Sequence, residues 1–264
     1  MKEAVILDHV LSIRRQMPRL GTKKLYHLLQ PILEGEGIKC GRDKLFTLLG
    51  REGLLITKRR KYTITTNSKH WLKKYPNLIR DIIPTRPEQI WVADITYVPG
   101  ARKHHYLHLI TDAYSKQIMS YDLSNDLEAG STLKALNMAL VKRQYPQEAL
   151  IHHSDRGLQY CSKLYTDTLK KNNIQISMTE NGDPYENPVA ERVNGILKEE
   201  FGLDKSGVES RAQQKQTRES IHIYNSLRPH LSCHMLTPLE MHKQNRLKIK
   251  TWRNEKASRN QVIS

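Results

Sequence analysis

Three acidic residues occupy positions at which metal chemistry is expected. Asp94 lies in the middle of the apolar run 91–98, Asp155 follows the apolar run 149–153, and Glu191 lies near the start of a predicted helix. A carboxylate within an apolar strand is costly unless it is paired or bound to a metal. Three converging carboxylates would repel one another, which implies cations. Carboxylate oxygens suit Mg²⁺, or Mn²⁺ in its place, and two such ions support phosphoryl transfer.

The elements that must position these acids alternate between strands and helices. Apolar or alternating runs predict three consecutive strands, joined by tight turns into an antiparallel meander, at 90–98, 105–113 and 117–123. A helix at 128–142, a strand at 149–153, a helix at 163–171 and a strand at 174–178 follow, before two last helices at 188–201 and 210–224. Strand and helix alternation demands parallel pairing. The predicted fold class is therefore α/β, with a mixed sheet flanked by helices.

Residues 3–54 form a different unit, a small all-helical module. Apolar residues recur at helical spacing, as shown by Ile6, Val10 and Ile13, then Leu25, Leu28, Leu29 and Ile32, and finally Leu45, Leu48 and Leu49. The polar faces carry basic residues, among them Arg42 and Lys44. Such a module resembles a helix-turn-helix element, which lays one helix in a DNA groove and contacts phosphates with its neighbours.

The net charge indicates a polyanionic partner. The chain of 264 residues carries +16, and residues 1–85 hold 18 Lys and Arg against 7 Asp and Glu. Nucleic acid is the simplest partner for such an excess. The run Lys58, Arg59, Arg60 and Lys61 opens a basic linker, for which a DNA-tracking role and a plain solvated connector both remain open.

Composition excludes several other classes of protein. The three cysteines, Cys40, Cys161 and Cys233, form neither a disulfide framework nor a Cys-x-x-Cys zinc site, and a reducing, cytosolic setting fits them. The histidine pairs at 104–105 and 152–153 have no cysteines at zinc-finger spacing nearby. No apolar stretch approaches the ~20 residues of a membrane helix, and no membrane partner is expected.

Three motifs together resemble those of OrfB-type transposases of the insertion-sequence-3 family, relatives of the retroviral integrases. They are WVADITY at 91–97, HSDRGLQY at 153–160, and the segment 186–198, which begins ENPVAER and ends at Lys198. The resemblance covers essentially the whole chain. It implies a ribonuclease-H-like core with a mixed five-stranded sheet, and a catalytic and metal-binding triad of Asp94, Asp155 and Glu191 with two Mg²⁺ ions.

The family spacing distinguishes Glu191 from its acidic neighbours. Between Asp155 and Glu191 lie 35 residues, and Lys198 follows Glu191 by seven. Glu186 shares the segment and is the reserve candidate, whereas Asp112 is interpreted as structural or turn-forming. DNA contacts are expected from Lys198, and from Arg42, Lys44, Arg59 and Arg60 in the N-terminal third. For Gln159 and Asn187, a contact with DNA and a structural role both remain open. The segment 225–230 also matches the family pattern, but no chemistry is assigned to it.

The resemblance implies Mg²⁺-dependent cleavage at the ends of a bacterial insertion sequence, followed by transfer of the freed strand to target DNA. It also implies oligomers on DNA, an upstream reading frame as fusion partner, and a cytoplasmic, nucleoid-associated protein. Two alternatives stay open, a non-catalytic DNA-binding regulator and a nuclease that only hydrolyses. The expected domains are the helical module 1–56, the linker 57–85, the catalytic core 86–243 and a basic, partly ordered tail 244–264.

Overall fold

A five-stranded mixed sheet is the centre of the computed structural model, which describes residues 2–57, 71–180 and 186–250. The strands are β1 (Ile90–Pro99), β2 (His104–Asp112), β3 (Ile118–Ser124), β4 (Ile151–Ser154) and β5 (Gln175–Met178). They lie in the order β3-β2-β1-β4-β5, with β1, β2 and β3 antiparallel and β1, β4 and β5 parallel. This confirms the predicted mixed sheet.

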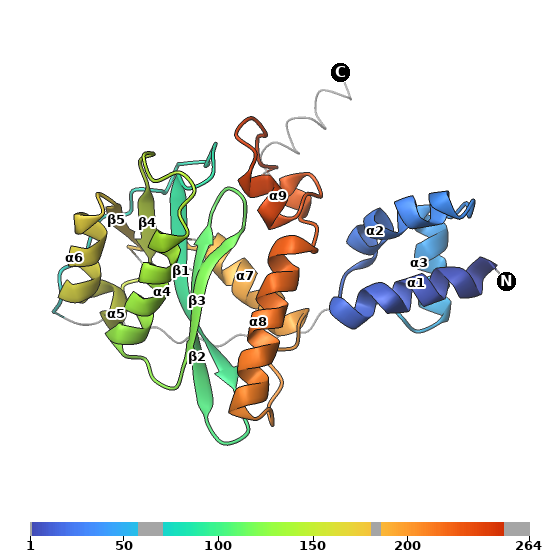
Figure 1. Ribbon diagram of the computed structural model, residues 1–264, viewed down its shortest axis with the longest axis horizontal. Helices are drawn as coiled ribbons and strands as arrows, with labels where there is room; N and C mark the ends of the chain where they lie inside the picture. Colours follow the sequence, from blue (N-terminus) through green and yellow to red (C-terminus); the bar gives the residue numbers. More distant parts are fainter. Residues whose placement is uncertain (1, 58–70, 181–185, 251–264) are drawn as a thin grey trace.

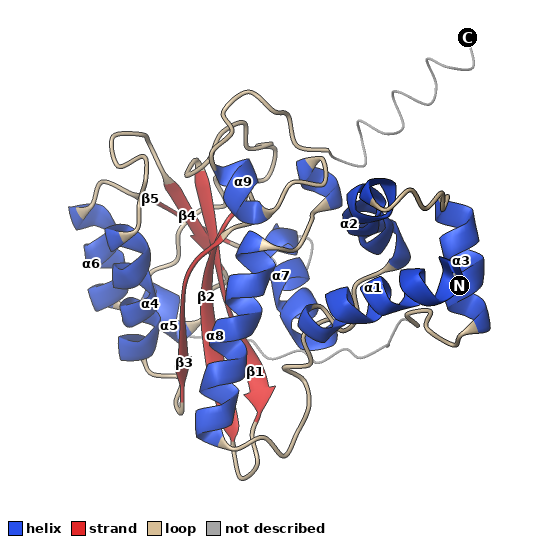
Figure 2. Cartoon of the chain, turned by 45° about the vertical axis from the view of Figure 1, so that its right-hand side comes forward, coloured by secondary structure: helices blue, strands red, loops and turns tan. Residues whose placement is uncertain are grey.

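Helices cover both faces of the sheet (Figure 2). One face carries α4 (Ala129–Val141), α5 (Leu158–Cys161) and α6 (Lys163–Lys171), of which the four-residue α5 was not predicted. The cores on the two faces are separate. Ile110 of β2 packs with Leu136 and Leu169, whereas its neighbour Leu109 points to the opposite face, because successive strand residues alternate.

The second face carries the helices that follow the sheet. They are α7 (Pro188–Glu199) and α8 (Ser210–Ser226), and the chain then forms the short 3₁₀ helix η2 (Leu231–Cys233) and α9 (Pro238–His242). The apolar stripe of α7 includes Val193, Ile196 and Leu197, all buried. This stripe fixes which side of α7 turns toward the sheet.

The N-terminal module consists of α1 (Lys2–Gln16), α2 (Thr22–Gly35) and α3 (Arg42–Arg51), as predicted (Figure 1). One prediction within it is wrong, because Ile32 is 39% exposed and Leu33 is buried in its place. The buried stripe of α2 runs through positions 25, 29 and 33, spaced at i, i+4 and i+8, and this leaves Ile32 at its edge.

The segments at the two boundaries of the core are more ordered than the sequence suggested. In the predicted linker, the backbone N–H of Leu78 donates to Ser177 Oγ, so residues 76–78 run beside β5. In the predicted tail, Leu247 and Ile249 pack against Tyr114. Apolar side chains that the basic composition concealed anchor both segments. Residues 58–61 and 251–264 lie outside the described residues. Among the described residues, no helix is long and apolar enough to span a membrane.

A buried charge cluster joins α9 to the start of β1. His242 lies 3.6 Å from a Glu88 carboxylate oxygen and 3.7 Å from an Asp112 oxygen, and all three side chains are fully buried. Burial opposes protonation of the imidazole, but hydrogen bonding and charge from Asp112 and Glu88 outweigh it and raise the pKa of His242 to about 9. Asp112 also accepts hydrogen bonds from the backbone N–H groups of Glu88 and Ser115, which confirms its structural role.

This cluster predicts a pH-dependent stability. The raised pKa of His242 means that its stabilising contribution is full below about 6.5, the ordinary histidine value, and is lost as pH rises through about 9. The difference in unfolding free energy between the wild type and His242→Gln, measured by urea denaturation, should therefore shrink between neutral pH and pH values above 9. The exposed His222→Gln is the control. An equal difference in unfolding free energy at both pH values would contradict the raised pKa of His242.

Candidate active site

The sheet register brings two of the predicted acids together. Strands β1 and β4 are parallel, with Trp91 beside His152 and Val92 beside His153. Continuing this register by two residues places Asp94 beside Asp155, which follows the last residue of β4. Because the ladder spacing between strands is only about 4.8 Å, the two carboxyl groups are neighbours.

Local hydrogen bonds hold each aspartate in place. One Asp94 oxygen accepts from the N–H of Ile95 at 2.9 Å, and the other accepts from Asn194 Nδ2 at 2.6 Å. An Asp155 oxygen accepts from the N–H of Gly157 at 3.0 Å. A Cβ at Gly157 would stand 3.0 Å from that Asp155 oxygen and 3.1 Å from Gln159 Oε1, so glycine keeps this turn open.

The charges of Asp155 and Glu191 both affect the pKa of Asp94. Burial raises the pKa of Asp94, the negative charge of Asp155 raises it further, and Glu191 adds to the effect, so that it reaches about 7. The hydrogen bonds from Ile95 and Asn194 act in the opposite direction but do not prevail. A carboxyl group so close to other carboxylates gains most from a bound cation.

Glu191 lies in the first turn of α7, one turn inside the Pro188 that begins the helix. Its side chain is exposed. Within the part of the chain that the structure describes, no three His, Cys, Asp or Glu side chains stand close enough together to hold a metal ion. The two aspartates are thus adjacent, while the glutamate influences Asp94 from a greater distance.

Two asparagines attach α7 to the strand that carries Asp94. Asn187 is 7% exposed and its Nδ2 donates to the Ala93 carbonyl at 3.0 Å, while Asn194 donates to Asp94 itself. Positions 187, 191, 194 and 198 follow i, i+4, i+7 and i+11 and share one face of the helix. Sequence reasoning missed Asn194, although this spacing would have indicated it. The side-chain oxygens of both asparagines are buried without a hydrogen-bond partner among the described residues.

These observations fit a divalent cation. The side chains that converge here offer carboxylate and amide oxygens, the hard ligands that Mg²⁺ and Mn²⁺ prefer. A cation beside Asp94 would remove the repulsion that raises its pKa, and the buried amide oxygens would point into a polar site.

The predicted DNA-contacting residues are spread more widely. Lys198 is half-buried; burial lowers its pKa, and the nearby Asp94 and Asp204 act in the opposite direction, which places the lysine in the field of the acids. Gln159 Nε2 donates to the Leu127 carbonyl at 2.8 Å. Asn187 lies in the interior, bonded to β1, rather than on a surface that DNA would reach.

The remaining predicted contacts belong to the N-terminal region. Arg42 and Lys44 are exposed on α3, away from the sheet, and Arg42 pairs with Asp43 at 2.9 Å. Arg59 and Arg60 lie outside the described residues. The reserve candidate Glu186 accepts a hydrogen bond from the N–H of Glu180 at 2.8 Å.

Comparison with known proteins gives the family. Models described as integrase core domain match residues 84–184 and 172–238. The insertion element IS600 uncharacterized 31 kDa protein of Shigella sonnei is 38% identical over 196 residues, which cover 73% of this chain and 72% of that protein. Transposase InsF for insertion sequence IS3A of Escherichia coli K12 is 31% identical, over 81% of this chain and 74% of that one. The chain belongs to the insertion-sequence transposases with an integrase core.

A solved structure supports the same fold. A chain of the simian T-cell lymphotropic virus intasome, in complex with PP2A regulatory subunit B56 gamma, superposes with a TM-score of 0.54 at 20% identity. The match covers 88% of this chain and 78% of that chain. The expected ribonuclease-H-like, integrase-type fold is therefore confirmed, and the family assignment makes this chain a DDE-type transposase.

The transposase also contains a buried ion pair at the far end of α7, which sequence reasoning did not assign. Arg228, 1% exposed, donates from Nε and from one terminal nitrogen to the two carboxylate oxygens of Glu200 at 2.8 and 2.6 Å. Its other terminal nitrogen contacts His230 Nε2 at 2.9 Å. Glu200 caps the C-terminus of α7, so this pair fixes the end of the helix that carries Glu191.

Breaking the pair should be costly. The Glu200→Gln substitution leaves Arg228 as a buried charge without its carboxylate, and we expect the unfolding free energy to fall by about 3–5 kcal/mol in urea denaturation. The control is Glu219→Gln, which removes the partner of the exposed Lys215 and should change stability by no more than about 0.5 kcal/mol. Equal effects of the two substitutions would contradict the structural role of the pair.

Proposed function

We propose that Asp94, Asp155 and Glu191 hold two Mg²⁺ ions, at which the transposase cuts the ends of its insertion sequence and joins them to target DNA. The observation that supports this most is the register of β1 and β4, which sets Asp94 beside Asp155. The charges of Asp155 and Glu191 also raise the pKa of Asp94. Mn²⁺ would serve in place of Mg²⁺. The bound ions would supply activation of the attacking oxygen and stabilisation of the leaving one.

The residues around the acids would hold this arrangement. Asn194 keeps one Asp94 oxygen oriented, and the Gly157 N–H does the same for Asp155. Asn187 ties the start of α7 to β1, and this would turn Glu191 toward the same site. In this proposal Asn187 positions α7 and does not contact DNA.

DNA would be bound both by residues close to the three acids and by the N-terminal module with its linker. Lys198 would place its ammonium group beside a phosphate close to the acids, where a charge-assisted contact is strong. Gln159 would contact the substrate next to Asp155. The N-terminal module 1–56, with Arg42 and Lys44, would bind the element end, and the linker from residue 57 onward, with Arg59 and Arg60, would follow the DNA backbone to the core.

The reaction would need no covalent protein intermediate. Water would attack the phosphodiester at the end of the element, and the freed 3′-hydroxyl would then attack a phosphodiester in the target. In the first step a phosphodiester bond breaks, the water oxygen joins the phosphorus, and a 3′-hydroxyl is freed. In the second step that hydroxyl forms a new phosphodiester bond while one phosphodiester bond of the target breaks. No serine or tyrosine nucleophile is therefore assigned.

Partners and location follow from this chemistry. Two DNA ends must be held together before joining, so the transposase would act as an oligomer on DNA. An upstream reading frame would supply a further DNA-binding segment by fusion. The site of action would be the bacterial cytoplasm, at the nucleoid, where the DNA is.

The central experiment is a cleavage and joining assay with Mg²⁺ and labelled DNA that carries the ends of the element. Asp94→Asn, Asp155→Asn and Glu191→Gln keep the side-chain shape but remove a metal-binding charge. Since metal ions contribute several kcal/mol to such reactions, each substitution should lower the cleavage rate by roughly 100-fold or more.

A matched control accompanies these substitutions. Glu199→Gln removes an exposed acid from the same helix and should cleave at the wild-type rate. Cleavage without joining by the wild type would indicate a nuclease that only hydrolyses. DNA binding without cleavage would indicate a regulator, or a need for the upstream fusion partner.

The raised pKa of Asp94 also predicts a pH-dependent metal requirement. Protons compete with Mg²⁺ for this carboxyl group, so the half-saturating Mg²⁺ concentration should fall as pH rises through about 7. The Asn194→Ala substitution removes a hydrogen bond that lowers this pKa, and the transition should move to higher pH. Asn137→Ala, at an exposed position of α4, is the control. A Mg²⁺ requirement that is independent of pH would argue against Asp94 as a ligand.

A further inference from the structure

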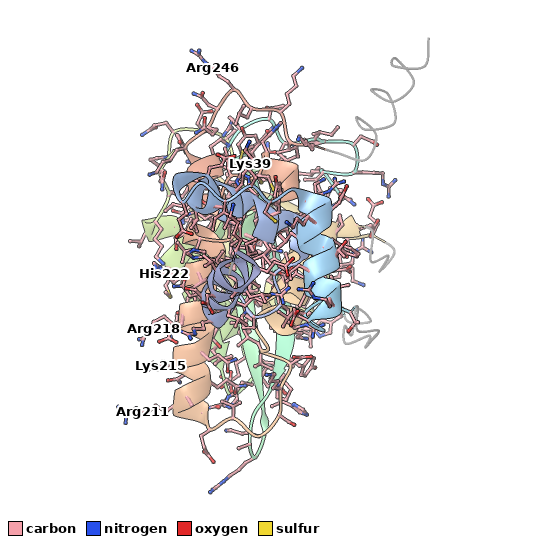
Figure 3. All side chains as sticks on the ribbon, turned by 90° about the vertical axis from the view of Figure 1, so that its right-hand side faces the viewer. Lys39, Arg211, Lys215, Arg218, His222 and Arg246 are labelled. Atoms are coloured by element: carbon pink, nitrogen blue, oxygen red, sulfur yellow. The ribbon has the colours of Figure 1, made fainter. Side chains whose placement is uncertain are left out.

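One face of α8 carries a row of exposed basic side chains. Arg211, Lys215, Arg218 and His222 follow i, i+4, i+7 and i+11 and lie one above the other along the helix (Figure 3). At 1.5 Å per residue the row is about 16 Å long. The opposite face of α8 is buried against the sheet and includes Thr217, Ile221 and Tyr224. The row therefore faces outward, on the catalytic core rather than on the N-terminal module.

Three members of this row, Arg211, Lys215 and Arg218, line one wall of a groove. Strand β3 contributes Tyr121 and Leu123, and α4 contributes Lys134 and Met138. The groove has a volume of about 970 Å³ and is open to solvent along its length. None of the three acids lines this groove.

Charge within the groove is predominantly positive. Four cationic side chains, Lys134, Arg211, Lys215 and Arg218, line it together with the two acids Asp122 and Glu209. Lys134 is neutralised by Asp122 at 2.6 Å, and Lys215 has only a weak exposed partner, Glu219, at 3.9 Å. Across the described residues, Arg211 and Arg218 enter no ion pair. Two guanidinium groups thus remain available to a ligand.

We propose that this α8 groove, defined by Arg211, Lys215, Arg218, Lys134 and Tyr121, binds the sugar–phosphate backbone of duplex DNA. The bound base pairs would lie away from those that reach the three acids. The inference rests on the proposed function, and adds a DNA surface on the core itself. A guanidinium group can donate two parallel hydrogen bonds to the oxygens of one phosphate. A row of such groups contacts successive phosphates and does not read the bases.

The same charges disfavour a second copy of this chain as the occupant. A two-fold dimer applies the same patch to itself, and it would bring the arginines of the two copies together. Like charges at an interface cost free energy unless acids are interleaved with them. Duplex DNA carries one negative charge per about 1.7 Å of helix axis, so several phosphates lie within the length of this row.

The salt dependence of DNA binding tests the proposal. The triple variant Arg211→Gln, Lys215→Gln, Arg218→Gln removes three cations from the groove. The control Lys163→Gln, Lys170→Gln, Lys171→Gln removes three from exposed positions of α6, on the opposite side of the sheet. Both are made in the Glu191→Gln background, so that a fluorescent duplex with an element end and flanking DNA is not consumed.

The two variants should differ in how steeply their affinity for DNA falls with salt concentration. Each phosphate contact contributes about 0.9 to the slope of log affinity against log salt, so the groove variant should lose about 2 to 3 from the magnitude of the slope. The α6 control should keep the slope of the parent protein. Equal slopes for the two variants would overturn the proposal. So would a change of oligomeric state, in sedimentation of the groove variant alone, without a change in slope.

The assay separates this inference from the proposed function. If the wild type cuts and joins DNA but the slopes are equal, only the groove assignment fails. If the slopes differ but the wild type does not cut with Mg²⁺, only the catalytic assignment fails. Because all six substituted side chains are exposed, both triple variants should keep the thermal unfolding midpoint of the parent.

Discussion

The parallel pairing of β1 with β4 is the constraint on which the rest of the site depends. It puts Asp94 and the residue after β4, Asp155, side by side, although 60 residues lie between them in the chain. Two adjacent carboxylates repel each other, and burial makes the repulsion stronger. The fold tolerates this cost through fixed hydrogen bonds from Ile95, Gly157 and Asn194. A site that is unfavourable without a cation is well suited to bind one.

Helix α7 connects this site to the rest of the molecule. Asn187 attaches its start to β1, Asn194 donates to Asp94 from its middle, and the Arg228–Glu200 pair fixes its end. The helix carries Glu191 on the surface and Lys198 half-buried. Its position is thus set at both ends by contacts away from the acids. Substitutions at either end of α7 would shift the helix and so change the position of Glu191 relative to the two aspartates.

Much of the fold could be predicted from the sequence because its signals are local. The alternation of apolar residues in 90–123 and the helical spacing in 3–54 indicated the elements, and strand–helix alternation indicated the parallel half of the sheet. The prediction for Ile32 was wrong because residues 32 and 33 both continue a helical stripe from Leu29, at i+3 and i+4. Packing, which the sequence does not show, decides between them.

The site was less completely predictable. The acids stand out by type and context, but whether they meet depends on register, and the distance of Glu191 from the aspartates depends on how α7 packs. Arg228 and Glu200 are 28 residues apart and look like ordinary surface charges. Burial of the arginine is a tertiary property. Likewise the burial of Asn187, whose amide donates to the Ala93 carbonyl, does not show in the sequence.

The number of metal ions that the acids hold can be measured directly. Mn²⁺ titration followed by electron paramagnetic resonance, on the full chain with element-end DNA, counts bound ions without requiring turnover. We expect two ions per wild-type active site, fewer ions or ions bound much more weakly in Asp94→Asn, and the wild-type result in Glu199→Gln. The same number and affinity of ions in the wild type and in Asp94→Asn would contradict this expectation.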